Sequence, residues 1–194
     1  MKITPVPCDI EPAKSDLVRS PGLHMSQIYG DYYSDLEPTR FVRGSKPDAV
    51  RMEAGFCLEE MLEEGLKRRH ATRPSEFTVR EDGSDIAFSP DLIIFENDQM
   101  RLGEIKLTWM SSKEVPREPA TSFPTKFDRY FTQMKLYCRA LGTARSRLYT
   151  YFVNGTYRPQ QPELLAWDID YTKQELDDEW RRQMNHARFK KLLK

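Results

Sequence analysis

The pattern of apolar residues along the chain predicts a mixed α/β or α+β fold, in which helices flank one central mixed β-sheet. Two segments, residues 48–69 and 127–141, carry apolar side chains at helical spacing. Runs rich in β-forming side chains predict strands at residues 76–80, 86–95, 100–108 and 148–153. The resulting order of helix, three strands, helix and strand is typical of a sheet with helices packed on its faces.

The first 47 residues, rich in proline and glycine, precede this pattern. Within them, His24 to Leu36 can form one short helix, and we expect the segment to be an arm that packs against the core. The next helix begins after Pro47, where Asp48 can act as its N-cap. The apolar face of that helix is formed by Val50, Ala54, Leu58, Met61, Leu62 and Leu66.

The most informative segment is the pair of β-rich runs around the polar turn 96–99, which predicts a β-hairpin. If the turn is centred on residues 97 and 98, Asp91 lies opposite Glu104, with their Cβ atoms roughly 4.5–5.5 Å apart on one face of the sheet. Two carboxylates at that distance repel each other and favour a divalent cation between them. Lys106 shares the face of Glu104, because strand side chains alternate, whereas Ile105 points into the core.

These residues suit metal-assisted hydrolysis of a phosphodiester. Asp91, Glu104 and the backbone carbonyl of Ile105 supply the oxygen ligands that Mg²⁺ prefers, with positions left for water. Lys106 can orient or deprotonate the attacking water, or stabilise negative charge on the phosphorus centre. The spacing alone is equally compatible with a surface hairpin in which Lys106 forms a salt bridge with Asp91 or Glu104.

After the hairpin, residues 111–125 contain three prolines and predict a loop, and Gly142 ends the helix that begins at Phe127. A further strand is expected at 164–169, and a charged helix at 171–193. The chain therefore divides into the arm (1–47), the core (48–170) and a C-terminal helix packed on the core (171–194).

Charge is unevenly distributed, although the formal net charge is zero. Residues 52–64 contain five glutamates and no basic residue. A positive surface that follows phosphates, together with an acidic pocket for a cation, would give this distribution. Two ordinary solvated helix faces would give it as well, and charge alone favours them. The basic residues between positions 126 and 147 are Lys126, Arg129, Lys135, Arg139, Arg145 and Arg147.

The remaining composition excludes several classes of protein. No apolar run approaches the ~20 residues of a membrane-spanning helix, and the N-terminus has no secretory signal, so we expect no membrane partner and a cytoplasmic location. Cys8, Cys57 and Cys138 lack paired spacing and predict neither disulfides nor a zinc site; the last two are expected to be buried or inert thiols. The three histidines, His24, His70 and His186, have no carboxylate or cysteine partner in the sequence pattern.

Several motifs together resemble a known family. Pro90-Asp91, followed after twelve residues by Glu104-Ile105-Lys106, resembles the motif of the PD-(D/E)XK nuclease superfamily. Gly55 with Glu59, and Gln133 with Tyr137, resemble two helix motifs of its RecB-like and phage-exonuclease branch, which includes lambda exonuclease. The motifs fall on the predicted elements in the family's order and cover residues 48–153. The segment RSPGLHMSQIY in the arm is a weaker match to phage-encoded members.

The resemblance implies a restriction-endonuclease-like core with the order αβββαβ, and a deoxyribonuclease that uses one or two Mg²⁺ or Mn²⁺ ions. Asp91, Glu104 and Lys106 are then the catalytic residues. The implied metal ligands are Asp91, Glu104, Ile105 and Glu59, with Glu60 as the alternative to Glu59 if the helix is rotated. The implied location is the cytoplasm of a bacterial or phage-infected cell.

The resemblance also implies contacts with double- or single-stranded DNA. Gln133 and Tyr137 share one helix face and are the expected substrate contacts, together with the neighbouring Lys135 and Arg129. The alternative for Tyr137 is a residue that anchors the helix to the core.

Three functions follow from these expectations. The first is an exonuclease of phage-type replication or recombination; the second is a structure-selective endonuclease of the same fold. The third is a nucleic-acid-binding module without activity, which the intact set of carboxylates and lysine argues against. An RNA substrate, a ring-like oligomer and a recombination partner protein are open alternatives by analogy.

Overall fold

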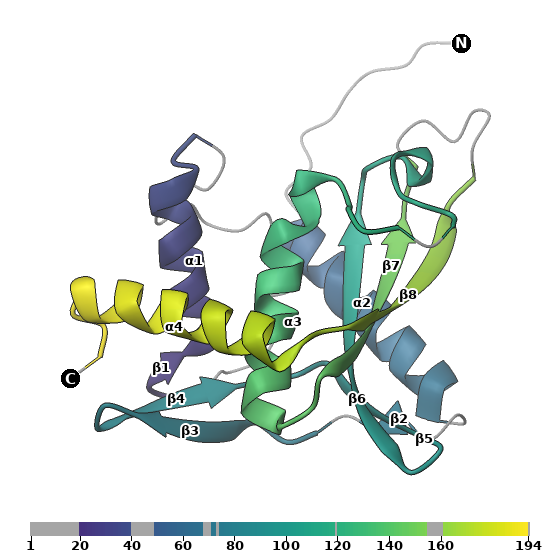
Figure 1. Ribbon diagram of the computed structural model, residues 1–194. Helices are drawn as coiled ribbons and strands as arrows, with labels where there is room; N and C mark the ends of the chain where they lie inside the picture. The colour runs from purple at the N-terminus through teal and green to yellow at the C-terminus, as the bar shows by residue number, and fades with distance from the viewer. Residues whose placement is uncertain are drawn as a thin grey trace.

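The structure, a computed structural model, describes residues 20–39, 49–67, 71–72, 74–118, 120–154 and 161–193 (Figure 1). It has a mixed α/β fold in which helices flank two mixed β-sheets, and so it confirms the predicted fold class. No helix in these ranges is long and apolar enough to cross a membrane.

The larger sheet carries the predicted hairpin. Its strand order is β2-β5-β6-β7-β8, and β6 and β7 are its parallel pair. Parallel neighbours need a crossover connection, and α3 (Asp128–Leu141) lies in the connection between them. The strands are β2 (Ala71–Thr72), β5 (Leu92–Glu96), β6 (Gln99–Thr108), β7 (Arg145–Phe152) and β8 (Glu163–Asp170).

The smaller sheet has the order β1-β4-β3. Its strands are β1 (Leu23–His24), β3 (Phe77–Glu81) and β4 (Ser84–Phe88). The turn between β3 and β4 contains Asp82 and Gly83, both with positive φ, as tight hairpin turns require.

The sequence prediction of one strand over residues 86–95, and of one central sheet, was wrong. The run forms two strands, β4 and β5, which belong to different sheets and are separated by Ser89, Pro90 and Asp91. Pro90 has no backbone N–H to donate and interrupts the pairing at this point. The short strands β1 and β2 were not predicted either, since two residues are too few to show a periodic pattern.

The four helices cover the sheets as the pattern of apolar residues predicted. The segment 111–125, expected to be a loop, contains a short 3-10 helix, Ser112–Glu114, and a second one begins at its end. In Figure 1, α3 lies on one side of the larger sheet and α2 behind it, while α1 and α4 pack beside α3. Gly142, with φ of 71°, ends α3 as predicted. The other helices are α1 (Met25–Leu36), α2 (Ala49–Lys67) and α4 (Lys173–Phe189).

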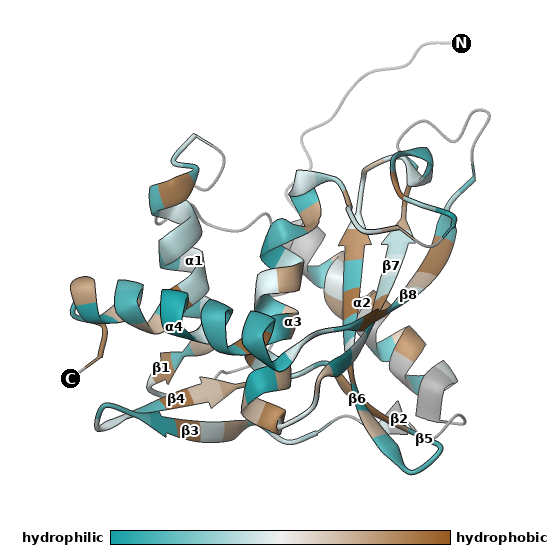
Figure 2. Cartoon of the chain, in the orientation of Figure 1, coloured by the Kyte–Doolittle hydropathy of each residue, from teal (hydrophilic) through white to brown (hydrophobic). Residues whose placement is uncertain are grey.

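Two hydrophobic clusters fill the space between these layers. The larger one joins α1, α3 and α4 to the sheets and includes residues of α1 such as Met25 and Ile28, both 0% exposed. The smaller one lies between α2 and the larger sheet and contains Leu58 and Ile105. Figure 2 shows the corresponding pattern, with hydrophobic residues along the strands and a largely hydrophilic outer side of α4. Ile105 thus points toward α2, and its neighbours Glu104 and Lys106 point toward α3.

Candidate active site

The hairpin of β5 and β6 has the predicted register. Its pairs run from Leu92 with Gly103 to Glu96 with Gln99, about a turn in which both central residues have positive φ. Asp91 lies one residue before β5, and its Oδ2 accepts a hydrogen bond of 2.8 Å from the N–H of Ile105. The carboxylate of Asp91 therefore binds the edge of β6 beside Glu104, where β5 has not yet begun.

Glu104 is buried, with 0% of its surface exposed. Nε2 of Gln133 on α3 donates to its Oε1 over 2.5 Å, and the hydroxyl of Tyr29 on α1 donates to Oε1 of Gln133 over 3.1 Å. Burial of a charged group is costly unless hydrogen bonds or an opposite charge compensate it. The chain of donors from α1 through α3 thus helps to hold the carboxylate of Glu104 on the face of the sheet that α3 covers.

The ammonium group of Lys106 lies between the two carboxylates. It forms an ion pair with Oε1 of Glu104 and lies 3.8 Å from Oδ2 of Asp91. It also lies 5.7 Å from the centre of the Tyr130 ring. Burial alone would lower the pKa of Lys106, but Glu104 and Asp91 outweigh it and hold that pKa well above its ordinary value. Lys106 is therefore an ammonium ion at neutral pH when these carboxylates are charged.

We call Asp91, Glu104 and Lys106 the carboxylate–lysine cluster. The salt bridge of Lys106 with the carboxylates, which the surface-hairpin alternative describes, is present. The hairpin does not expose these side chains, however, because those of Asp91 and Lys106 are only 15% and 19% exposed. The two carboxylates converge on one positive charge, the ammonium of Lys106.

The donors around this position fit a hard divalent cation such as Mg²⁺ or Mn²⁺. The N–H and C=O of one strand residue point to the same side of the strand. Since the N–H of Ile105 donates to Asp91, the carbonyl of Ile105 also points to the side of β6 on which Asp91 lies. Two carboxylates and one carbonyl are thus available from the residues named in the sequence prediction.

The helix motif on α2 is described in part. The backbone of Glu59 belongs to α2, which packs against β6, but its side chain lies outside the described residues. The alternative ligand, Glu60, is exposed. Gly55 of the same motif is not needed for a close approach of α2 to the sheet, because a Cβ at this position would meet nothing within 4 Å.

The expected substrate contacts on α3 separate into two faces. Gln133 contacts Glu104, and Arg129, one turn earlier, places its guanidinium 5.4 Å from the centre of the Tyr29 ring, on the α1 side of the cluster. Lys135 is two residues from Gln133 and so points to the other side of the helix. Its ammonium lies 5.9 Å from the centre of the Tyr171 ring. The structure thus brings two of these residues together near the cluster and places Lys135 elsewhere.

Tyr137 anchors α3 to the core, which was the alternative to its role as a substrate contact. It is 4% exposed and packs edge to face against Phe88 in the larger hydrophobic cluster. Burial raises the pKa of its hydroxyl far above the ordinary value. In this position its ring is covered by core residues and does not offer a face for stacking on a base.

Three residues near the cluster were missed by the sequence prediction. Tyr29 donates a hydrogen bond to Gln133, and the ring of Tyr130 lies near the ammonium of Lys106. Neither was named as a site residue, although Tyr29 ends the arm segment that resembles phage-encoded proteins and Tyr130 lies on the helix of the Gln133–Tyr137 motif. Gly103 precedes Glu104, and a Cβ at Gly103 would lie 2.8 Å from Cβ of Leu92. Only glycine lets the two strands of the hairpin approach at this pair.

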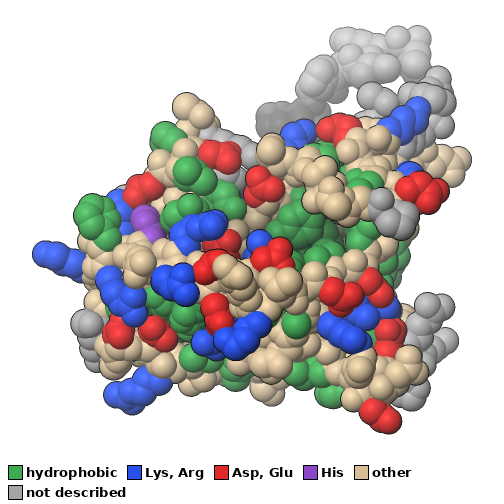
Figure 3. All heavy atoms as spheres, viewed as in Figure 1, with side chains coloured by type: hydrophobic (Ala, Val, Ile, Leu, Met, Phe, Trp, Pro, Cys, Tyr) green, Lys and Arg blue, Asp and Glu red, His purple; other side chains and the backbone are tan. Residues whose placement is uncertain are grey.

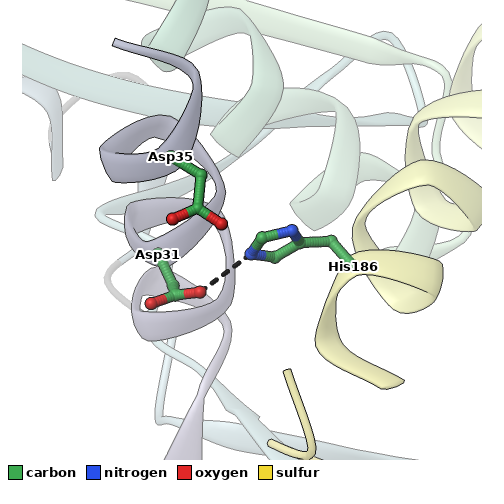
Figure 4. Close-up of side chains that lie close together, drawn as sticks. All are labelled: Asp31, Asp35 and His186. Carbon is green, nitrogen blue, oxygen red and sulfur yellow. Dashed lines mark hydrogen bonds and ion pairs between the residues drawn. The ribbon is translucent and has the colours of Figure 1, made fainter. Parts of the chain in front are cut away.

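Figure 4 shows a second group of polar side chains, formed by Asp31 and Asp35 of α1 and His186 of α4. One ligand atom from each lies within 4.8 Å of the others. Nε2 of His186 is 2.8 Å from Oδ2 of Asp31, and Nζ of Lys190 is 2.6 Å from Oδ2 of Asp35. The C-terminal end of α4 is thus joined to α1 by the contact between His186 and Asp31 and by the ion pair between Lys190 and Asp35, apart from the carboxylate–lysine cluster.

The histidines have no partner in the sequence pattern, but in space His186 lies next to Asp31, and Nδ1 of His24 lies 3.6 Å from Oε2 of Glu76. His70 lies outside the described residues. Of the two cysteines expected to be buried or inert, one is buried. Cys138 is buried, and burial raises the pKa of its thiol to about 12, whereas Cys57 is exposed. Cys8 lies outside the described residues.

The basic segment 126–147 does not form an uncompensated positive surface. At least four of its six basic residues form ion pairs with acidic residues of other elements, and the shortest of these is Arg147 with Asp168, 2.5 Å, followed by Arg139 with Asp177 and Arg147 with Glu96, both 2.7 Å. On the face shown in Figure 3, basic and acidic side chains are interspersed. The alternative of ordinary solvated faces is therefore the better description.

Comparison with known proteins supports the fold. The chain is similar to the solved structure of a phage-related exonuclease from Haemophilus somnus 129PT, with a TM-score of 0.51 and 13% sequence identity over 84% of this chain and 78% of that one. It also matches the structure of SSO0001 with a TM-score of 0.48 and 14% identity, over 81% of this chain and 70% of that one. No protein-family model and no curated protein matches the chain.

Proposed function

We propose that the protein is a metal-dependent nuclease of the PD-(D/E)XK type that hydrolyses phosphodiester bonds in DNA. The observation that carries this proposal is the carboxylate–lysine cluster, in which the residues of the motif converge beside the edge of β6. Its support is the agreement between motif spacing, hairpin register and burial, together with a fold similar to that of a phage-related exonuclease.

In this proposal, Asp91, Glu104 and the carbonyl of Ile105 hold Mg²⁺ or Mn²⁺, and Glu59 is a further candidate ligand. The bound ion would polarise the phosphate and lower the pKa of a coordinated water. Gln133 holds the carboxylate of Glu104 in place by its hydrogen bond, as residues behind metal ligands commonly do.

Lys106 contributes positive charge. Because its pKa is raised, its ammonium remains protonated at neutral pH in the metal-free protein. Next to a bound phosphodiester, it would stabilise the negative charge that develops on the phosphate oxygens during attack by water. We assign Lys106 to stabilisation of charge because its ammonium lies beside the two carboxylates that would hold the metal.

We favour an exonuclease over an endonuclease of the same fold because the similar structure with a TM-score above 0.5 is that of a phage-related exonuclease. Incubation with labelled linear duplex, single-stranded and covalently closed circular DNA tests this choice, each with Mg²⁺, with Mn²⁺ and with chelator. Metal-dependent loss of linear DNA alone supports an exonuclease, whereas nicking of closed circles identifies an endonuclease. If no substrate is cut with either metal, the proposed function is wrong.

A further inference from the structure

A hollow of about 720 Å³ lies along the edge of β6, next to the carboxylate–lysine cluster. Pairing between β5 and β6 stops at Leu92 and Gly103, so in the part of the chain that the structure describes no strand covers this edge beyond Gly103. One turn of α2 forms the facing wall. The residues that line the hollow include Gly55, Phe56, Lys106, Trp109, Met110 and Lys126.

The hollow adjoins the cluster, because Lys106 belongs to the cluster and also lines the hollow. Trp109 follows Lys106 by three residues, which corresponds to roughly 10 Å of extended chain. The backbone groups of alternate strand residues point to the same side, so those of Leu107 point to this edge together with those of Ile105. A molecule in the hollow would therefore meet an indole, backbone amide groups and an ammonium in sequence.

The walls combine flat apolar surface with positive charge. Trp109 is 45% exposed, although large aromatic side chains are usually well buried. Phe56 and Met110 are half-buried beside it. At the rim, the side chain of Lys126 is 56% exposed, and its Nζ lies 3.8 Å from Oε2 of Glu114. An exposed indole near lysine side chains suits a nucleotide, whose base stacks on aromatic rings and whose phosphate is drawn to ammonium groups.

We propose that this hollow binds one unpaired nucleotide of a DNA strand, with its base on the indole of Trp109 and the adjoining phosphodiester directed toward Lys106. The inference rests on the proposed nuclease function, which places the scissile phosphate at the carboxylate–lysine cluster. It adds a substrate class: single-stranded DNA or a frayed end. Bases within a duplex stack on their neighbours, so their faces are not available to Trp109.

Equilibrium binding tests this inference without any cleavage. The anisotropy of a labelled single-stranded oligo(dT) and of a blunt duplex is measured with Ca²⁺ and with chelator, for the wild type, Trp109→Ala and Trp109→Phe. Loss of one base stack should weaken binding of oligo(dT) to Trp109→Ala between about 5-fold and 150-fold, whereas Trp109→Phe stays within about threefold of the wild type. Phe95→Ala is the matched control, because Phe95 is 50% exposed on β5 and does not line the hollow.

Duplex binding should change little in Trp109→Ala, and oligo(dT) should quench the indole fluorescence of the wild type more than that of Trp109→Phe. The inference is overturned if the wild type does not bind oligo(dT), or if Trp109→Ala binds it as the wild type does or loses equal affinity for both DNA forms. Failure of the nuclease proposal looks different: the wild type would cut no DNA with metal, while Trp109-dependent binding persisted. If Trp109→Ala instead cleaves single-stranded DNA with an unchanged KM, the proposed nucleotide site in the hollow is wrong and the proposed nuclease function stands.

Discussion

Replacement of Lys106 by methionine removes the ammonium between the two carboxylates and keeps a side chain of similar length. In the metal-free variant, Glu104 stays 0% exposed and retains the hydrogen bond from Gln133, but loses its ion pair with Lys106. Removal of one partner of a buried ion pair costs about 3–5 kcal/mol, because the remaining charge is not solvated. The retained hydrogen bond places the expected loss near the lower end, about 3 kcal/mol.

A bound divalent cation would restore positive charge at the same carboxylates. We therefore expect Mg²⁺ or Mn²⁺ to recover much of the stability that Lys106→Met loses in chelator. Urea unfolding near neutral pH measures both values; with a slope of about 2 kcal/mol/M, the midpoint should fall by roughly 1.5 M in chelator. The folded-state pKa of Lys106 is raised, so its contribution is fully present below the unfolded value of about 10.4 and is lost only as the pH rises through the higher folded value.

Two controls isolate the effect. Lys113 is exposed, and Lys113→Met should change stability by no more than about 0.5 kcal/mol. The same measurements in a His186→Gln background exclude stabilisation by metal at the group of Asp31, Asp35 and His186. Loss of a buried ion pair should lower the free energy of unfolding by about 3 kcal/mol in chelator. A loss below about 1 kcal/mol there would refute the reasoning. A loss of the same size with and without metal would refute it as well.

Two further predictions concern residues beside the cluster. Gly103→Ala places a Cβ 2.8 Å from Cβ of Leu92, so overpacking should lower the free energy of unfolding by about 1–3 kcal/mol, measured by urea denaturation. Gly65→Ala, where a Cβ meets nothing within 4 Å, should instead stabilise α2 by roughly 0.5–1 kcal/mol; similar effects at both positions would contradict this account. Gln133→Leu removes a donor to Glu104 and should reduce metal affinity or the cleavage rate about 10- to 100-fold, and an unchanged rate and affinity would remove Gln133 from the site.

The sequence predicted the hairpin well because two local rules specify it. Alternation of side chains fixed which of residues 104–106 share a face, and the polar turn fixed the pairing, so the register from Leu92 onward is as predicted. The same reasoning extended the strand too far, through Pro90. The proline that belongs to the motif also ends the strand, and this break frees Asp91 to bind the edge of β6.

Features that depend on packing between distant segments could not be predicted. Helical spacing shows that Gln133 and Tyr137 share a face of α3, but not that one end of this face meets Glu104 and the other enters the core. The contact of Tyr29 with Gln133 joins residues 104 positions apart, and that of His186 with Asp31 joins residues 155 positions apart. No local pattern carries such pairs.

Charge along the sequence left two descriptions of the surface open and favoured ordinary solvated faces. The structure agrees with that preference, because Arg139 pairs with Asp177, and Arg147 pairs with Glu96 and Asp168. A run of like charges in sequence is compensated in space by acids from other elements. The positive charge nearest the proposed chemistry is instead Lys106, which the motif identified.

Asp91 and Glu104 are the residues that we propose hold a catalytic metal. The most direct test of this claim is the initial rate of DNA cleavage with Mn²⁺ for the wild type, Asp91→Asn and Glu104→Gln, beside Glu118→Gln, which changes an exposed glutamate away from the cluster. Since each cluster variant removes a ligand charge, we expect metal-dependent cutting by the wild type and Glu118→Gln, and a loss of at least about a hundredfold in the other two. Cleavage by Glu104→Gln at the wild-type rate, from a protein that is folded by circular dichroism, would contradict the claim.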